Sequence, residues 1–196
     1  MRASRVFVDS NVLASKTLRD WLFLVQQDSG GMYSTYTSHD VLTEAVRVQR
    51  RRHPKLNGDL PAKMQAALRK NMTEVLEDFP GDVVFGGTDP DDHHIHAAAL
   101  ACRADIVLTS NGRDFGDPDA LDYEVLTPDE FLVLADDSAP QVIRRVVLTQ
   151  LEYWQRIEGA RSLDEALVAA DCRKFAARVR PYILSVGSGF QETSFS

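Results

Sequence analysis

Segments of strand type alternate with segments of helical spacing along most of this chain, and this alternation restricts the fold more than any other feature. Strand-type runs occur at residues 5–8, 31–37, 82–85, 105–109 and 123–126. Most are followed by a stretch long enough to carry the chain back before the next strand. Because parallel strands need such crossovers, usually helical, the order predicts an α/β fold: a three-layer α/β/α sandwich with a mostly parallel central sheet.

Helices are expected between these strands, and two of them carry start signals. The apolar spacing of an amphipathic helix recurs at residues 15–27, 40–52, 60–79 and 93–103. Thr37 and Asp40 have the spacing of a capping box that opens the second of these helices. Thr127 and Glu130 form another, with Pro128 at the first helical position, and predict a short helix over 130–135.

Beyond residue 135 the pattern changes to helices alone. Two amphipathic segments are present, at residues 141–158 and 163–180. Gly159 and a capping box of Ser162 and Glu165 separate them, and Pro181 is expected to end the second. The chain is therefore expected to comprise an α/β domain, a two-helix extension and a flexible tail, at residues 1–135, 136–184 and 185–196.

Composition excludes several classes of protein and raises one objection. The 196 residues are 44% hydrophobic and 26% charged, close to the globular average. Cys102 and Cys172 lack the spacing of a disulfide framework or zinc ribbon, no apolar run approaches the roughly 20 residues of a membrane span, and the N-terminus lacks a signal-peptide pattern. A cytoplasmic protein without membrane contact is expected. Its net charge of −7 disfavours a nucleic-acid partner unless the acids serve another purpose.

Four acidic residues fall where the carboxyl ends of the predicted strands should meet. They are Asp9, Glu44, Asp92 and Asp114. In an open parallel sheet the ligand site lies beyond these strand ends. Two carboxylates 4 Å apart repel by about 4 kcal/mol at an effective dielectric constant of 20, and a hard divalent cation such as Mg²⁺ or Mn²⁺ removes that repulsion. A bound ion can also activate water, so the pattern indicates metal-dependent phosphodiester hydrolysis.

The residues around these acids resemble a known family. The segments VFVDSNVL, LTEAVR, DDHHIHAAALACRADIVLTSN and TSNGRDF are similar, in this order, to the acidic motifs of PIN-domain ribonucleases, especially the VapC-type toxins of bacterial toxin–antitoxin pairs. The resemblance covers residues 4–134. It implies dependence on Mg²⁺ or Mn²⁺, RNA cleavage that leaves a 5′ phosphate and a 3′ hydroxyl, self-association as a homodimer, and inhibition by a small antitoxin.

The same resemblance implies a role for each motif residue. Asp9, Asp92 and Asp114 would bind the metal ion. Glu44 would lie within reach of the attacking water. The supporting residues would be Ser10, Thr109, Asn111 and Asp91; Thr109 and Asn111 would steady the turn that presents Asp114.

Asp91 remains an alternative to Asp92 as the acid of the third motif. In the family that acid stands three residues before an apolar helical position, a spacing that Asp92 has relative to Ile95 and Asp91 lacks. The basic run at residues 47–55 begins one helical turn after Glu44. RNA contacts are therefore expected from Arg47, Arg50, Arg51 and His93.

The sequence lacks the features of several other functional sites. His93 and His96 lie one helical turn apart, but no cysteine or HExxH pattern stands near them to complete a zinc site. A phosphohydrolase with Asp9 as nucleophile usually has a second aspartate two residues on, where this chain has Asn11. No glycine-rich phosphate loop of a GTPase or dinucleotide enzyme is present. A non-catalytic scaffold or regulator that binds a partner protein stays open.

Overall fold

The computed structural model describes residues 2–55, 57–154 and 161–192, which divide into two compact units. Unit 1 runs to Arg19 and resumes from Gly31 to Thr127. Unit 2 takes Asp20–Gly30 and the chain from Pro128 onward. The predicted boundary after residue 135 thus lies inside unit 2.

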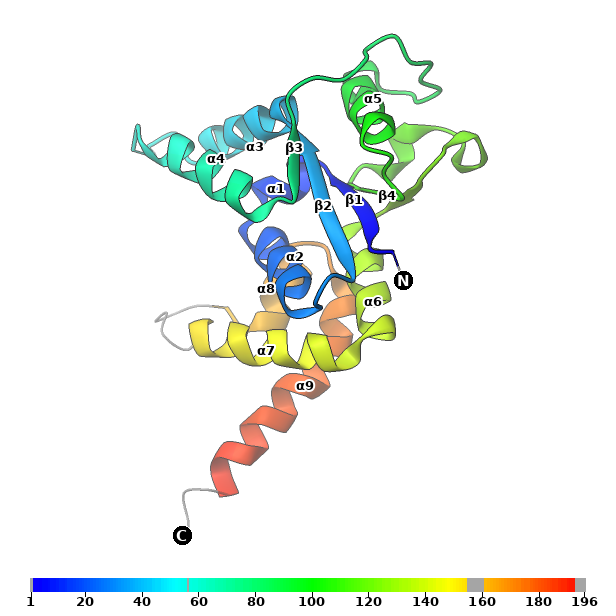
Figure 1. The fold of residues 1–196 in the computed structure, drawn as a ribbon. Coiled ribbons are helices and arrows are strands. Elements are labelled where there is room, and N and C mark those ends of the chain that lie inside the picture. Colours follow the sequence, from blue (N-terminus) through cyan, green and yellow to red (C-terminus); the bar gives the residue numbers. More distant parts are fainter. Residues whose placement is uncertain (1, 56, 155–160, 193–196) are drawn as a thin grey trace. The chain divides into compact units, whose positions relative to one another are not determined.

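Unit 1 is built on a five-stranded sheet in which every pair of neighbouring strands is parallel, in the order β3-β2-β1-β4-β5 (Figure 1). The strands are β1 (Ser4–Val8), β2 (Tyr33–Ser38), β3 (Glu74–Leu76), β4 (Ile106–Leu108) and β5 (Glu124–Leu126). Val6, Phe7 and Val8 of the central strand are fully buried, as expected for a sheet covered on both faces. The predicted α/β fold with a parallel sheet is confirmed.

The helices of unit 1 form the two outer layers. They are α1 (Ser10–Ala14), α3 (His39–Arg52), α4 (Leu60–Asn71) and α5 (His93–Ala101), while α2 (Lys16–Asp28) passes from unit 1 into unit 2. The chain moves from β1 to β2 to β3 and then returns across the sheet to β4. Because such crossovers are right-handed, α1, α3 and α4 cover one face and α5 covers the other.

The structure corrects two predictions near the third strand. The helix predicted over 60–79 ends at Asn71, and Glu74–Leu76 instead pairs with β2 at the sheet edge. The strand predicted at 82–85 is irregular, and Val84 is 93% exposed. Both errors concern apolar runs of only a few residues, for which periodicity does not separate helix from strand.

The helix start predicted at Thr37 lies one residue later. Ser38 is the N-cap of α3, and its hydroxyl accepts a hydrogen bond from the Val41 N–H at 3.2 Å. Thr37 is still part of β2, where its buried hydroxyl donates to the Val8 carbonyl at 3.0 Å. Only Thr37 has an acid three residues on, at Asp40, but its hydroxyl is bonded to Val8 within the sheet, and Ser38 caps the helix instead.

Unit 2 is helical, with α6 (Pro128–Ser138), α7 (Pro140–Trp154), α8 (Leu163–Ala169), α9 (Arg173–Glu192) and the later part of α2. Its core includes Trp21, whose ring meets that of Phe175 edge-on with centroids 4.9 Å apart. The helix predicted over 163–180 is two helices, because Asp171 adopts φ of +63° between α8 and α9. Within the part of the chain that the structure describes, no helix is long and apolar enough to cross a membrane.

Two predicted boundaries of unit 2 have different outcomes. The capping box is confirmed: Ser162 accepts from the Glu165 N–H, and the Glu165 carboxylate accepts from the Ser162 N–H. The prediction that Pro181 ends the last helix is wrong, because α9 continues through it to Glu192; residues 185–192, expected in a flexible tail, are helical. Gly159 and the end of the first predicted helix, residues 155–158, lie outside the described residues.

Candidate metal centre

The carboxyl ends of β1 and β4 bring the first and fourth motifs together. Asp9 follows β1 directly, and its N–H donates to the Leu108 carbonyl at the end of β4, at 3.1 Å. Thr109 follows β4, and its N–H donates in the same way to Leu126 at the end of β5. These main-chain bonds continue the sheet by one residue and fix both side chains at its edge.

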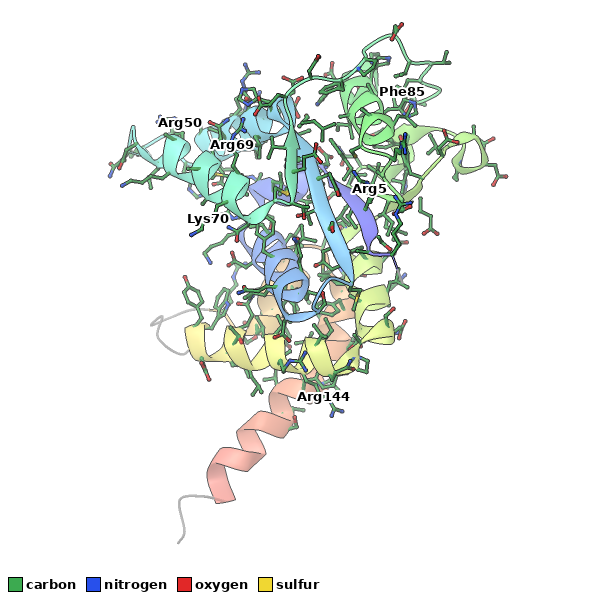
Figure 2. All side chains as sticks on the ribbon, in the orientation of Figure 1. Arg5, Arg50, Arg69, Lys70, Phe85 and Arg144 are labelled. Carbon is green, nitrogen blue, oxygen red and sulfur yellow. The ribbon has the colours of Figure 1, made fainter. Side chains whose placement is uncertain are left out.

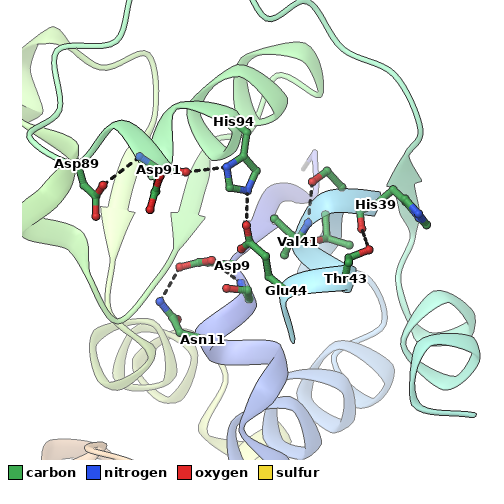
Figure 3. Close-up of polar contacts among 12 residues, drawn as sticks. Asp9, Asn11, His39, Val41, Thr43, Glu44, Asp89, Asp91 and His94 are labelled. Atoms are coloured by element: carbon green, nitrogen blue, oxygen red, sulfur yellow. Dashed lines mark hydrogen bonds and ion pairs between the residues drawn. The ribbon is translucent and has the colours of Figure 1, made fainter. Parts of the chain in front are cut away.

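Asp9 is held by three donors and is only 3% exposed. Its carboxylate accepts from the Ser10 N–H, from the Asn11 side-chain amide at 2.5 Å and from the Thr109 hydroxyl at 2.7 Å; Figure 3 shows the contact with Asn11. Asp9 is also the N-cap of α1. Both oxygens therefore already serve as acceptors within unit 1.

Thr109 connects the motifs around it. While its hydroxyl donates to Asp9, the same oxygen accepts from the Asn11 amide at 3.0 Å and from the Asn111 N–H at 3.1 Å. The Asn111 carbonyl then accepts from the Asp114 N–H at 3.0 Å. The 3₁₀ turn η2 (Gly112–Phe115) starts from this fixed point, so Thr109 and Asn111 lie at the base of the turn that presents Asp114.

Three carboxylates meet at this sheet edge. One oxygen each from Asp89, Asp92 and Asp114 lies within 4.8 Å of the other two, and we call these residues the acid cluster. Asp92 ends the 3₁₀ turn η1 (Pro90–Asp92) and is the residue before α5. Its Oδ2 is buried without a hydrogen-bond partner. Carboxylate oxygens are the protein ligands that Mg²⁺ and Mn²⁺ prefer, so the acid cluster could hold such an ion.

The electrostatics of Asp92 show how closely the acids are gathered. Burial, followed by the charges of Asp9, Asp89 and Asp114, raises the pKa of Asp92 from 3.8 to about 6. Asp9 is thus close enough to repel Asp92, although it is not a member of the acid cluster. A divalent cation among these side chains would remove the repulsion and give the unpartnered oxygen a ligand bond.

Asp89 reaches the acid cluster through a tight contact between two loops. The Thr88 N–H donates to the Asp114 carbonyl at 2.9 Å, which aligns residue 89 with the turn that carries Asp114. A Cβ on Gly87 would overlap that same carbonyl oxygen and the Phe85 ring. The sequence pattern did not indicate a role for Asp89. Gly86 and Gly87, just before it in the chain, and Gly116, at φ of +82°, were the available signal.

Asp92 and Asp91 differ in exposure and in their distance from the other acids. Asp92 belongs to the acid cluster, whereas Asp91 is exposed and does not belong to it. The Asp91 carbonyl lies 2.7 Å from His94 Nδ1. Because a carbonyl only accepts, Nδ1 carries the proton. His94 Nε2 then faces Glu44 Oε1 at 3.4 Å, within ion-pair distance but without hydrogen-bond geometry, so this contact is ionic only when His94 is protonated (Figure 3).

The remaining predicted residues do not belong to the acid cluster. His93 Nε2 is 3.0 Å from the Val83 carbonyl, and His96 Nδ1 is 2.7 Å from the Tyr123 hydroxyl. Neither histidine belongs to a group of metal-ligating side chains among the described residues. The basic side chains expected to contact RNA are exposed on α3; they are Arg47, Arg50 and Arg51.

Replacing Thr109 with valine is expected to lower the free energy of unfolding by about 1–3 kcal/mol, because the buried Asp9 carboxylate and the Asn111 N–H both lose a partner. Thermal or urea denaturation measures the change. Thr43→Val is the matched control, since the Thr43 hydroxyl donates only within its own helix, to His39, and should change stability by less than about 0.5 kcal/mol. Equal losses in both variants would contradict this account of Thr109.

Comparison of the chain with protein-family models, with curated proteins and with solved structures gives no match.

Proposed function

We propose that unit 1 is a Mg²⁺- or Mn²⁺-dependent endoribonuclease of PIN type, acting as the toxin of a VapC-type toxin–antitoxin pair in which RNA cleavage inhibits translation. The acid cluster carries the proposal, because it combines three converging carboxylates with a buried, unpartnered oxygen of Asp92. The motif resemblance supports RNA as the substrate. A small antitoxin as partner, homodimer formation and a cytoplasmic location rest on that resemblance and on composition.

The side chains around the acid cluster have distinct roles in this proposal. Asp89, Asp92 and Asp114 would hold the ion, which when bound supplies an activated water and neutralises phosphate charge. Asp9 is kept in place by its three donors and adds negative charge that attracts the cation. We assign Glu44 as the acceptor of the proton from the attacking water. The water oxygen joins phosphorus as the bond to the 3′ oxygen breaks, and the departing oxygen takes a proton from solvent, which leaves a 5′ phosphate and a 3′ hydroxyl; Glu44 later returns its proton to solvent.

Two other functions fit the geometry less well. An aspartyl phosphohydrolase needs an accessible nucleophile, whereas Asp9 is 3% exposed and both its oxygens accept hydrogen bonds. A scaffold needs no convergence of acids, and gathering them costs stability in the absence of a cation. The nuclease accounts for both observations.

The test is cleavage of an end-labelled RNA by the purified full chain. We expect cleavage with Mg²⁺ or Mn²⁺, none with EDTA, and at least about a 100-fold loss in Asp114→Asn, which removes one member of the acid cluster. Asp82→Asn is the control: Asp82 is exposed to solvent and lies outside the acid cluster, and its loss should leave the rate unchanged. A wild-type protein without metal-dependent cleavage would favour the scaffold, and phosphate bound covalently to Asp9 would favour the phosphohydrolase.

A further inference from the structure

We infer that the hairpin of α3 and α4 is a second RNA-binding surface, which engages nucleotides several positions away from the scissile phosphate. The inference rests on the proposed nuclease function and adds a requirement for RNA that continues on one side of the cut. It also extends the expected contacts beyond α3 to the connecting segment and to α4. We call residues 45–72 the basic hairpin.

The basic hairpin has a charge opposite to that of the whole chain. It contains eight lysines and arginines and one aspartate, a formal charge of +7 within a protein of −7. The other residues therefore carry −14. A net negative protein that concentrates its positive charge on one pair of helices presents a local field that attracts a polyanion.

Little of this positive charge is neutralised within unit 1. Ion pairs hold Lys63 to Asp59 and Arg69 to Glu77, each at 2.6 Å. Five further basic residues are exposed and make no ion pair within the described part of the chain: Arg47, Arg51, Arg52, Lys55 and Lys70. Arg47 and Arg51 stand four residues apart on one helix, where like charges destabilise. Phosphates lying along this surface would remove that repulsion.

The hairpin is basic along its whole length. Its base is at the sheet, where Arg69 near the end of α4 lies 2.8 Å from His39 at the start of α3. Its tip is the segment between the helices, which contains Lys55. Figure 2 shows Arg50, Arg69 and Lys70 distributed over the two helices. Cations are favourable near helix C-termini, which explains the basic residues in the last turns of α3 and α4. This effect does not explain Arg47 or Lys55.

RNA fits this surface better than a protein partner does. A protein interface usually has an apolar centre, whereas the only large apolar side chain exposed on the described part of the hairpin is Leu60, at 38%. Phosphate recognition needs mainly exposed arginine and lysine.

Two arginines of the basic hairpin lie on the same stripe of α3 as Glu44, which connects this surface to the candidate metal centre. Glu44, Arg47 and Arg51 follow one another at helical spacings of three and four residues, so they lie on one stripe of α3. Seven residues of helix span about 10 Å, and stacked nucleotides of one strand advance about 3.4 Å each. Arg51 is therefore about three nucleotides beyond Glu44, and the tip of the hairpin is further still.

The test compares RNA binding to Arg51→Gln/Arg52→Gln and to wild type in EDTA, where no cleavage occurs. Glutamine keeps helix propensity and removes only the charge. For a 12-nucleotide RNA we expect the Kd to rise about tenfold and the slope of log K against log salt to become shallower by about 1.4, at about 0.7 per lost phosphate contact. Fluorescence anisotropy measures both. With Mn²⁺ present, the ratio of kcat/KM for the 12-nucleotide RNA to that for a 4-nucleotide RNA should fall.

The matched control is Arg173→Gln/Lys174→Gln, which removes two exposed charges at the start of α9 and should bind the 12-nucleotide RNA like wild type. Equal effects of the two double variants, or an unchanged Kd and salt slope in the α3 variant, would overturn the inference; the latter result would point to a protein partner for the hairpin. Failure of the nuclease proposal is a separate outcome, recognised by RNA binding in EDTA without cleavage when metal is added.

Discussion

Asp92→Asn is expected to abolish metal-dependent RNA cleavage and, in the absence of metal, to make the protein more stable at neutral pH. The two effects have one cause. Asp92 carries an unpartnered buried oxygen and is repelled by Asp9, Asp89 and Asp114. Asparagine has nearly the same shape, lacks the charge, and offers an amide that can donate to the neighbouring carboxylates. The substitution would therefore remove both a proposed metal ligand and a buried negative charge that the neighbouring acids repel.

The pH dependence of this gain in stability follows from the direction of the shift. The pKa of Asp92 is raised from 3.8 to about 6 in the folded protein, so the folded state binds the proton more tightly than the unfolded state. The contribution of Asp92 to stability is therefore present below about pH 4 and is lost as the pH rises to about 6. The variant lacks this loss, so the difference between variant and wild type should grow between pH 4 and 6 and then stay constant.

Thermal denaturation in EDTA measures the prediction. Because Asp92 is partly exposed and solvent screens its charge, we expect a rise in Tm of about 2–4 °C at pH 7, equivalent to about 1 kcal/mol for a chain of this size. Mn²⁺ should raise the Tm of wild type but not of the variant, and the rate of RNA cleavage should fall at least about 100-fold. A variant that is less stable than wild type in EDTA at pH 7, or that keeps its cleavage rate, would contradict the account of the acid cluster.

The predicted features that the structure reproduces depend on local pattern. The central strand before Asp9 and the helix that begins at His93 are marked by apolar runs bounded by polar caps, and the structure has both. The capping box at Ser162 is decided by residues three apart and is present as well. Such features depend on residues within one or two turns of each other, which a single sequence contains.

The features that the prediction missed depend on contacts between distant segments. Leu76 lies in a strand because residues 74–76 pair with the edge of β2. The three residues by themselves do not indicate that β2 will be available as a partner. Pro181 remains inside α9 although proline usually disfavours the helix interior.

The candidate site shows the same division. The sequence supplied Asp9, Asp92 and Asp114. Asp9 stands directly after a strand-type run, Asp92 stands directly before a helix, and Asp114 lies in the turn that follows the fourth run. It did not supply Asp89, whose place in the acid cluster depends on a loop that folds back onto the turn after Asn111. Nor did it indicate that His94 would face Glu44, since these two residues come from different helices.

This loop contact leads to the second large effect that we expect, in Gly87→Ala. A Cβ at residue 87 would overlap the Asp114 carbonyl oxygen and the Phe85 ring. The carbonyl is main chain in a turn already fixed through Asn111, and Phe85 packs against His96 and Phe115 with ring centroids 5.1 and 6.0 Å away. The loop must therefore move, and we expect the free energy of unfolding to fall by about 1–3 kcal/mol.

The same movement would separate Asp89 from Asp114, so we expect the affinity for Mn²⁺ to fall about 10–100-fold, as measured by calorimetric titration. Gly86→Ala is a closely matched control. It adds the same methyl group to the adjacent residue, where a Cβ would meet nothing within 4 Å and φ is not positive. Alanine there should be neutral or stabilise the protein by up to about 1 kcal/mol, since it restricts the unfolded chain. If both alanine variants bind Mn²⁺ equally well, the contact at Gly87 does not position the acid cluster.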